Sequence, residues 1–97
     1  MKTVPLGNTG LDVSALCLGA MYFGTRQNQS ESFALMDQYY EAGGRFFDTA
    51  NIYAWWDDNG VGGESEPVLG AWIRERKNRD RVFVATKVGF GYQDVPA

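Results

Sequence analysis

The stretch FFDTANIY, residues 46–53, starts as a short apolar strand, reaches a carboxylate at Asp48, and has a phenol at Tyr53 five positions later. A carboxylate at the end of a buried strand costs free energy unless a nearby group compensates its charge. The compensating group therefore indicates which other strand lies beside this one, and the expected architecture follows from finding it.

The segments before this stretch predict a hairpin and a strand. Residues 3–13 have two β-prone arms around the turn-rich residues 7–10, and Pro5 indicates an edge position. Residues 14–21, SALCLGAM, form a continuous apolar run, which is typical of a strand that is covered on both faces.

Two helices are predicted from capping residues and apolar spacing. Asn28 and Glu31 have the spacing of a capping box, and residues 43–44, both glycine, are expected to end the helix that follows. Ser65 is expected to cap a second helix. The apolar residues at helical spacing are Phe33, Leu35, Met36, Tyr39 and Tyr40 in the first helix and Val68, Leu69, Trp72 and Ile73 in the second.

The predicted order is a β-hairpin followed by β-α-β-α-β, with residues 45–50 and 81–87 as the second and third strands. Alternating strands and helices argue for an α/β fold with a parallel sheet and right-handed crossovers. Three parallel strands are few for a closed core, since a barrel typically takes ~250 residues and a doubly wound sheet also has more strands. We therefore expect residues 1–97 to be a single incomplete domain, the front part of a longer protein or of an assembly.

Composition excludes several classes of function. The net charge is -3 with acids and bases interspersed, so there is no basic stripe for nucleic acid or an anionic membrane. The sequence has no apolar signal core and no run of ~20 apolar residues. Cys17 is the only cysteine, so no intramolecular disulfide can form, and its apolar neighbours predict a buried, inert thiol. These features favour the cytoplasm.

Histidine is absent from the sequence. Its absence excludes Ser-His-Asp and Cys-His catalysis within the chain and argues against a zinc site. The adjacent acids Asp57 and Asp58 lack the regular spacing of cation ligands, so we expect them at a solvated loop tip and expect no metal site.

The compensating group for Asp48 is expected to be Lys87. Asp48 ends the second predicted strand and Lys87 ends the third. Adjacent parallel strands are spaced ~4.8 Å apart, and their carboxyl ends meet at one rim, where the chemistry of parallel α/β proteins is found. The two charges can therefore neutralise each other at that rim.

Tyr53, on the loop that leaves the second strand, can fold back over the same rim. An unperturbed tyrosine has a pKa of ~10, which is too high for an efficient proton donor near neutrality. A neighbouring ammonium stabilises the phenolate and lowers that pKa. Asp48, Tyr53 and Lys87 together therefore predict a general acid that protonates an oxygen as negative charge develops on it, as carbonyl reduction by hydride requires.

Each of these residues also has a simpler interpretation. Asp48 alone is consistent with a strand-end ion pair, Tyr53 with a packed aromatic, and Lys87 with a solvated charge. Lys87 could also be the nucleophile of a Schiff-base enzyme. The pairing of a carboxylate with a phenol favours proton transfer.

The same residues carry a resemblance. GRFFDTANIY (residues 44–53), the pattern G-E-S-E-x-x-L-G (residues 63–70) and VFVATK (residues 82–87) resemble the aldo-keto reductase family, and so do the N-terminal hairpin and the LCLGAM segment. The match extends from about residue 4 to about residue 90. This resemblance implies the first part of a (β/α)8 TIM barrel, incomplete in this chain, in an oxidoreductase that reduces an aldehyde or ketone to an alcohol with NADPH.

The resemblance also implies roles for individual residues. Tyr53 would be the proton donor, Lys87 would tune it, and Asp48 would support Lys87. Ala20, Met21 and Asp48 would border the cofactor, NADPH or NADP+. The substrate pocket for a small carbonyl compound would include Tyr53, Trp55 and Trp56.

The sequence departs from the family where the chain stops. The family usually has a catalytic histidine on the next strand, and it holds the cofactor mainly through its last strands and loops. We therefore expect residues 1–97 alone neither to bind NADPH tightly nor to turn over. A non-catalytic binding or regulatory subunit of the potassium-channel β-subunit type is the alternative, and the sequence predicts no oligomeric state.

Overall fold

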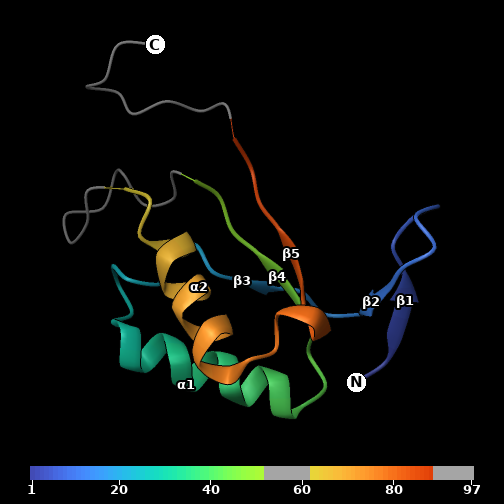
Figure 1. Cartoon of the computed structure of the whole chain (residues 1–97), viewed down its shortest axis with the longest axis horizontal. Coiled ribbons are helices and arrows are strands. Elements are labelled where there is room, and N and C mark those ends of the chain that lie inside the picture. Colours follow the sequence, from blue (N-terminus) through green and yellow to red (C-terminus); the bar gives the residue numbers. More distant parts are fainter. Residues whose placement is uncertain (52–61, 89–97) are drawn as a thin grey trace.

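The computed structural model describes residues 1–51 and 62–88, which form two small sheets and two α-helices (Figure 1). The elements in chain order are β1 (Thr3–Pro5), β2 (Asp12–Ser14), β3 (Leu18–Gly19), α1 (Gln29–Glu41), β4 (Phe46–Asp48), α2 (Ser65–Arg76), the 3-10 turn η1 (Arg79–Arg81) and β5 (Phe83–Ala85).

β4 is the central strand of a three-stranded parallel sheet with the order β3-β4-β5. Phe47 pairs with Leu18 on one side and with Val84 on the other. Figure 1 shows α1 and α2 together on one side of this sheet, and the antiparallel hairpin β1–β2 beyond its end. The predicted order of a hairpin followed by β-α-β-α-β is therefore confirmed. In residues 1–51 and 62–88, no further strand lies beside β3 or β5.

The first parallel strand is shorter than the apolar run predicts. β3 covers only Leu18–Gly19, because Ser14 ends β2 and the residues between them connect the hairpin to the parallel sheet. Cys17 lies in this connection and is exposed, so the expectation of a buried thiol is wrong. Residues 14–21 therefore connect the hairpin to the parallel sheet and do not form one strand that is covered on both faces.

α1 begins and ends where its capping residues predict. The Asn28 side chain accepts a hydrogen bond from the Glu31 N–H at 2.8 Å, and the Glu31 carboxylate accepts one from the Asn28 N–H at 3.0 Å. The helix ends at a cap on Ala42, and Gly43 follows with φ +98°, a conformation that glycine adopts without strain. Leu35 is 43% exposed, so it lies outside the buried stripe.

α2 lacks the predicted N-cap. The capping position is held by Glu64, which makes no side-chain capping bond, and Ser65 is the first residue of the helix. Ser65 is buried, because its hydroxyl is used at the ends of the parallel strands. The predicted apolar stripe, which is Val68, Leu69, Trp72 and Ile73, is buried as expected. Among the described residues, no helix has the length and apolar content needed to cross a membrane.

The core lies between the helices and the central strand. Phe47 of β4, Met36 of α1 and Trp72 of α2 have no exposed surface. The Phe47 ring lies 5.2 Å from the Trp72 ring and 5.3 Å from the Tyr39 ring, centroid to centroid. Such tilted and edge-on contacts add to the free energy that burial of aromatic area contributes. The packing fixes β4 beneath both helices.

The Tyr39 hydroxyl joins α1, the hairpin and the start of β4. It lies 2.5 Å from the Leu16 carbonyl oxygen, 2.8 Å from the Phe46 carbonyl oxygen and 2.9 Å from Ser14 Oγ. It also accepts a hydrogen bond from the Phe46 N–H at 3.1 Å. The chain passes so close to the Tyr39 ring at Gly44 that a Cβ there would overlap ring atoms.

Removal of this hydroxyl should destabilise the fold. In Tyr39→Phe, polar groups of three segments lose a shared partner, and we expect the free energy of unfolding to fall by about 1–3 kcal/mol. Urea denaturation measures the change. Tyr40→Phe is the matched control, because that ring packs edge-on against Trp72 and no hydrogen bond of its hydroxyl occurs in the described part of the chain. Equal losses in both variants would contradict this role of Tyr39.

α1 and α2 are joined at their outer side through Asp37. Its carboxylate accepts hydrogen bonds from Trp72 Nε1 at 2.8 Å, from Arg76 Nε at 2.8 Å and from Arg76 Nη2 at 2.7 Å. The bonds from Arg76 hold the pKa of the Asp37 carboxyl below its usual value, burial opposes them, and the Trp72 bond adds to the lowering. The charged form of Asp37 is therefore favoured in the folded state.

This shift predicts a pH dependence of stability. The folded pKa of Asp37 lies below its unfolded value of ~3.9, so the contribution is complete above that pH and is lost as the pH falls through the folded pKa. The stability difference between wild type and Asp37→Asn should therefore be largest near neutrality and shrink below about pH 4. Urea unfolding over a pH series measures it. In an Arg76→Gln background the pH-dependent part should be smaller, and an unchanged dependence there would contradict the assignment to Arg76.

Candidate functional site

The carboxyl ends of β4 and β5 stay paired beyond the strands themselves. Asp48 pairs with Ala85 in the parallel register. The Thr49 N–H donates to the Ala85 carbonyl at 2.8 Å, and the Asn51 N–H donates to the Lys87 carbonyl at 3.1 Å. This continued backbone pairing brings the residues after both strands to one rim, as the sequence predicts.

Asp48 and Lys87 meet at this rim. Lys87 Nζ donates to Asp48 Oδ1 at 2.8 Å and to the Thr49 carbonyl oxygen at 2.7 Å. The prediction that the Lys87 ammonium compensates the Asp48 carboxylate is therefore confirmed. The Lys87 and Asp48 side chains are 51% and 42% exposed, so solvent screens the pair. An ion pair this exposed is worth about 1 kcal/mol or less, so its main effect is to fix the direction of the ammonium.

Thr49, whose carbonyl accepts Lys87, also carries a buried hydroxyl that pairs with the buried hydroxyl of Ser65. Thr49 Oγ1 and Ser65 Oγ are 2.6 Å apart, and Ser65 Oγ donates to the Ala20 carbonyl oxygen at 2.6 Å. These bonds join the residue after β3, the residue after β4 and the first residue of α2. Sequence reasoning missed this connection because Ser65 stands where a helix N-cap is expected.

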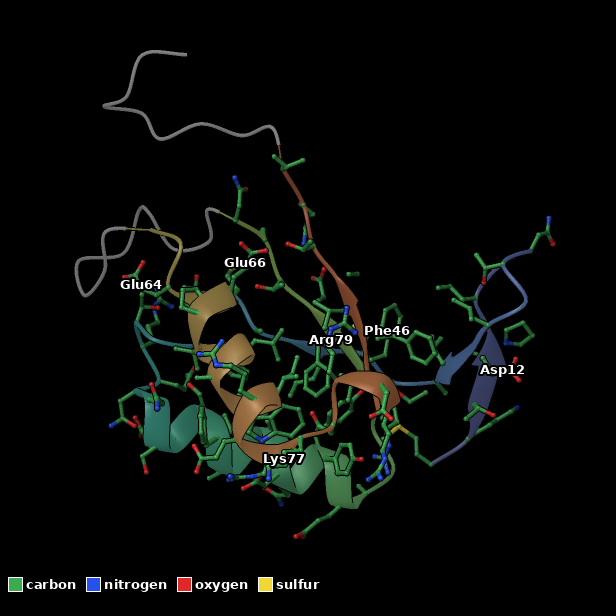
Figure 2. The ribbon with its side chains drawn as sticks, in the orientation of Figure 1. Asp12, Phe46, Glu64, Glu66, Lys77 and Arg79 are labelled. Carbon is green, nitrogen blue, oxygen red and sulfur yellow. The ribbon has the colours of Figure 1, made fainter. Side chains whose placement is uncertain are left out.

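A second polar contact joins α2 to the residues after β5. Thr86 Oγ1 donates to Glu66 Oε2 at 2.6 Å. Glu64 and Glu66 lie at the N-terminal end of α2 and Lys77 at its other end (Figure 2). The N-terminal end of α2 therefore contacts the segments that follow all three parallel strands. The sequence signal for this contact is Glu66 in the first helical turn, and no local pattern indicates its partner Thr86.

The residues predicted to border the cofactor differ in their accessibility. Ala20 has no exposed surface, its N–H donates to the Asp48 carbonyl at 2.9 Å, and its carbonyl accepts from Ser65. Met21, in the turn that follows, is half-buried. Met21 and the Asp48 side chain thus offer the accessible surface of this set, and the cofactor-bordering role of all three residues stays a prediction.

The predicted proton donor and substrate pocket lie outside the described residues. Tyr53, Trp55 and Trp56 fall between residues 51 and 62, as do Asp57 and Asp58. Their predicted roles therefore stay predictions. Within residues 1–51 and 62–88, no three histidine, cysteine or acidic side chains come together as a metal-binding group.

The Cys17 thiol is within electrostatic reach of the ion pair. Partial burial raises its pKa above the usual value, the Asp48 carboxylate raises it further, and the Lys87 ammonium lowers it. The thiol form is therefore favoured, which makes Cys17 a poor nucleophile at neutral pH.

Comparison with known proteins extends this geometry to a family. Residues 15–97 match the model of the aldo/keto reductase family. The chain is 43% identical over 89 residues to the uncharacterized oxidoreductase YrpG of Bacillus subtilis, a match that covers 91% of this chain and 26% of that protein. It is 40% identical over 92 residues to norsolorinic acid reductase of Aspergillus flavus, covering 88% of this chain and 22% of that protein.

A solved structure supports the fold. Aldo-keto reductase AKR11C1 from Bacillus halodurans, in its holo form, matches with a TM-score of 0.76 and 32% identity, over 97% of this chain and 28% of that one. The chain thus spans about a quarter of the length of the oxidoreductase YrpG and of norsolorinic acid reductase. The described sheet and helices correspond to part of a (β/α)8 barrel, and both the predicted fold class and the predicted resemblance are confirmed.

The exposure of the ion pair predicts that it adds little to stability. Asp48→Asn should change the free energy of unfolding by less than about 1 kcal/mol, because solvent screens both charges. Urea denaturation measures it. Phe47→Ala, one position earlier and fully buried, is the comparison, with an expected loss of about 3–5 kcal/mol. A loss of that size in Asp48→Asn would show that the ion pair is a structural element of the fold.

Proposed function

Because this chain belongs to the aldo/keto reductase family, we propose that it contributes the proton-transfer residues of an oxidoreductase that reduces an aldehyde or ketone to an alcohol with NADPH. The partner in this reaction is a small carbonyl compound. The activity is that of a complete barrel, and residues 1–97 alone are expected to bind NADPH weakly and not to turn over.

The observation that carries the proposal is the contact of 2.8 Å between Lys87 Nζ and Asp48 Oδ1 at the carboxyl ends of neighbouring parallel strands. Asp48 and the Thr49 carbonyl hold the ammonium at the rim. A charge fixed in this way stabilises a nearby phenolate and so makes a tyrosine a better proton donor. Tyr53, five residues after Asp48, takes the donor role by its likeness to the family motif.

The proton-transfer step follows from these roles. Tyr53 gives its hydroxyl proton to the carbonyl oxygen of the substrate as negative charge develops there, and Lys87 stabilises the phenolate that remains. NADPH, when bound, supplies the hydride that adds to the carbonyl carbon. Met21 and Asp48 provide the accessible rim beside which the nicotinamide would lie.

The same contact disfavours a Schiff-base enzyme. A lysine that attacks a carbonyl must first lose its proton to have a free lone pair, whereas the Asp48 carboxylate, 2.8 Å from Lys87 Nζ, favours the protonated amine. Proton transfer uses this ammonium as it stands.

Replacement of the proposed donor tests the function. Tyr53→Phe is introduced into the protein expressed in its native host. The variant should lower kcat for benzaldehyde reduction by about 10²–10⁴-fold, because the ring is kept and only the proton donor is removed. The loss of NADPH absorbance measures turnover, and quenching of tryptophan fluorescence measures NADPH binding, which should be unchanged.

Two controls separate the function from its alternative. Tyr40→Phe removes a hydroxyl from the last turn of α1, which leads into the N-terminal end of β4 and not to the rim at its carboxyl end, and should keep wild-type turnover. The 97-residue polypeptide made alone should show no turnover. If the isolated protein binds NADPH but does not reduce benzaldehyde or other simple aldehydes, the proposal is wrong and a regulatory binding subunit becomes the better interpretation. If Tyr53→Phe is as active as wild type, the assignment of Tyr53 as the proton donor is wrong.

A further inference from the structure

Thr49 and Ser65 are both 1% exposed, yet the Thr49 hydroxyl bonds outside the adjacent strand β4 and the Ser65 hydroxyl bonds outside the helix α2. Ser65 is the first residue of α2 and not its N-cap, and its hydroxyl bonds to Thr49 and to the Ala20 carbonyl. Thr49 follows β4, and its side chain reaches the first residue of α2. Buried hydroxyls cost free energy unless they are hydrogen-bonded, and here they satisfy each other and the Ala20 carbonyl.

The direction of the hydrogen bonds in this pair follows from the number of protons. Ser65 has one hydroxyl proton, and the Ala20 carbonyl oxygen, 2.6 Å away, can only accept. Ser65 therefore donates to Ala20, and Thr49 Oγ1 must donate to Ser65 Oγ across the remaining 2.6 Å. The result is a one-way relay from Thr49 through Ser65 to Ala20, in which both hydroxyl protons are used.

The relay fixes the peptide group that receives Lys87. The Thr49 side chain is held by Ser65, and its N–H is held by the Ala85 carbonyl at 2.8 Å. The Thr49 carbonyl oxygen then accepts the Lys87 ammonium at 2.7 Å. At the other end of the relay, the Ala20 N–H donates to the backbone carbonyl of Asp48. The side chain of Asp48 is the other acceptor of the Lys87 ammonium.

We propose that Thr49 and Ser65 are positioning residues, whose buried hydroxyl relay holds the Thr49 carbonyl and the end of β3 in place so that the Lys87 ammonium stays fixed at the rim. The catalytic consequence of this inference rests on the proposed function, whereas the positioning itself is a property of the described residues. A relay that served only to stabilise the fold would affect unfolding without a selective effect on Lys87.

Amine reactivity distinguishes these two roles. The chain has three lysines, Lys2, Lys77 and Lys87, and acetylation by acetic anhydride followed by peptide mass spectrometry gives a separate rate for each. In Thr49→Val, which keeps the shape of the side chain, the rate of Lys87 relative to Lys2 and Lys77 should rise about fivefold, the factor that loss of one hydrogen bond of ordinary strength gives. Ser65→Ala should raise the same ratio.

Two further variants serve as controls. Thr49→Ser keeps the hydroxyl and should restore the wild-type ratio. Ser32→Ala removes an equally buried hydroxyl, which donates to the carbonyl of Asn28, the N-cap of α1, at 2.7 Å, and should leave the ratio unchanged. Circular dichroism establishes that each variant is folded under the labelling conditions. Since Ser65→Ala tests the relay at its other member, the test remains decisive if Thr49→Val does not fold.

The outcomes separate the relay from the proposed function. An unchanged Lys87 ratio in folded Thr49→Val or Ser65→Ala, or an equal rise in Ser32→Ala, would overturn the relay whatever the activity. A selective rise at Lys87 supports it even if the wild-type protein fails to reduce benzaldehyde, in which case the proposed function alone is wrong. If the protein is a reductase, Thr49→Val should lower kcat with little change in KM, because it disturbs the donor and not substrate binding.

Discussion

Parallel pairing of β4 with β5, in the register that sets Asp48 opposite Ala85, is the constraint on which the rest of the structure depends. A strand has a side-chain period of two, so this register decides at once which side of β4 faces the helices and which residues reach the rim. Phe47 is directed into the contact with Trp72 and Tyr39, and Asp48 is left at the strand end, within reach of Lys87. Core and candidate site therefore follow from a single alignment.

The polar groups near the rim are divided by charge. The ionised side chains, Asp48 and Lys87, remain about half exposed, which avoids the large cost of desolvating an ion pair. The groups that are fully buried, Thr49 and Ser65, are neutral and hydrogen-bonded. A site arranged in this way keeps its charges available to a reacting molecule while the buried hydroxyls limit movement of the backbone. The exposed ion pair contributes little to stability, so its value lies in geometry.

Much of this could be predicted from the sequence, and the failures share a cause. The capping box of α1, the apolar stripe of α2 and the Asp48–Lys87 pair all follow from local spacing or from the alignment of parallel strands. Local rules also predict an N-cap at Ser65 and a buried thiol at Cys17, and both predictions are wrong, because Ser65 bonds to the distant Ala20 and Cys17 lies in the exposed connection between the two sheets. The Thr49–Ser65–Ala20 relay joins residues up to 45 positions apart, and no local pattern reveals it. The likeness of residues 44–53 to a family motif, by contrast, gave the fold of a much longer barrel.

The close approach of Gly44 to the Tyr39 ring links two positions that are five residues apart in the chain. The ring occupies the space that any side chain at position 44 would need, and its hydroxyl anchors the hairpin and β4 only from that place. Relatives that keep a tyrosine at the first position are therefore expected to keep a glycine at the second, and those with a larger residue at the second should have replaced the tyrosine. In a directed-evolution library, randomising codon 44 alone would return almost only glycine, whereas randomising codons 39 and 44 together would open this part of the fold to change.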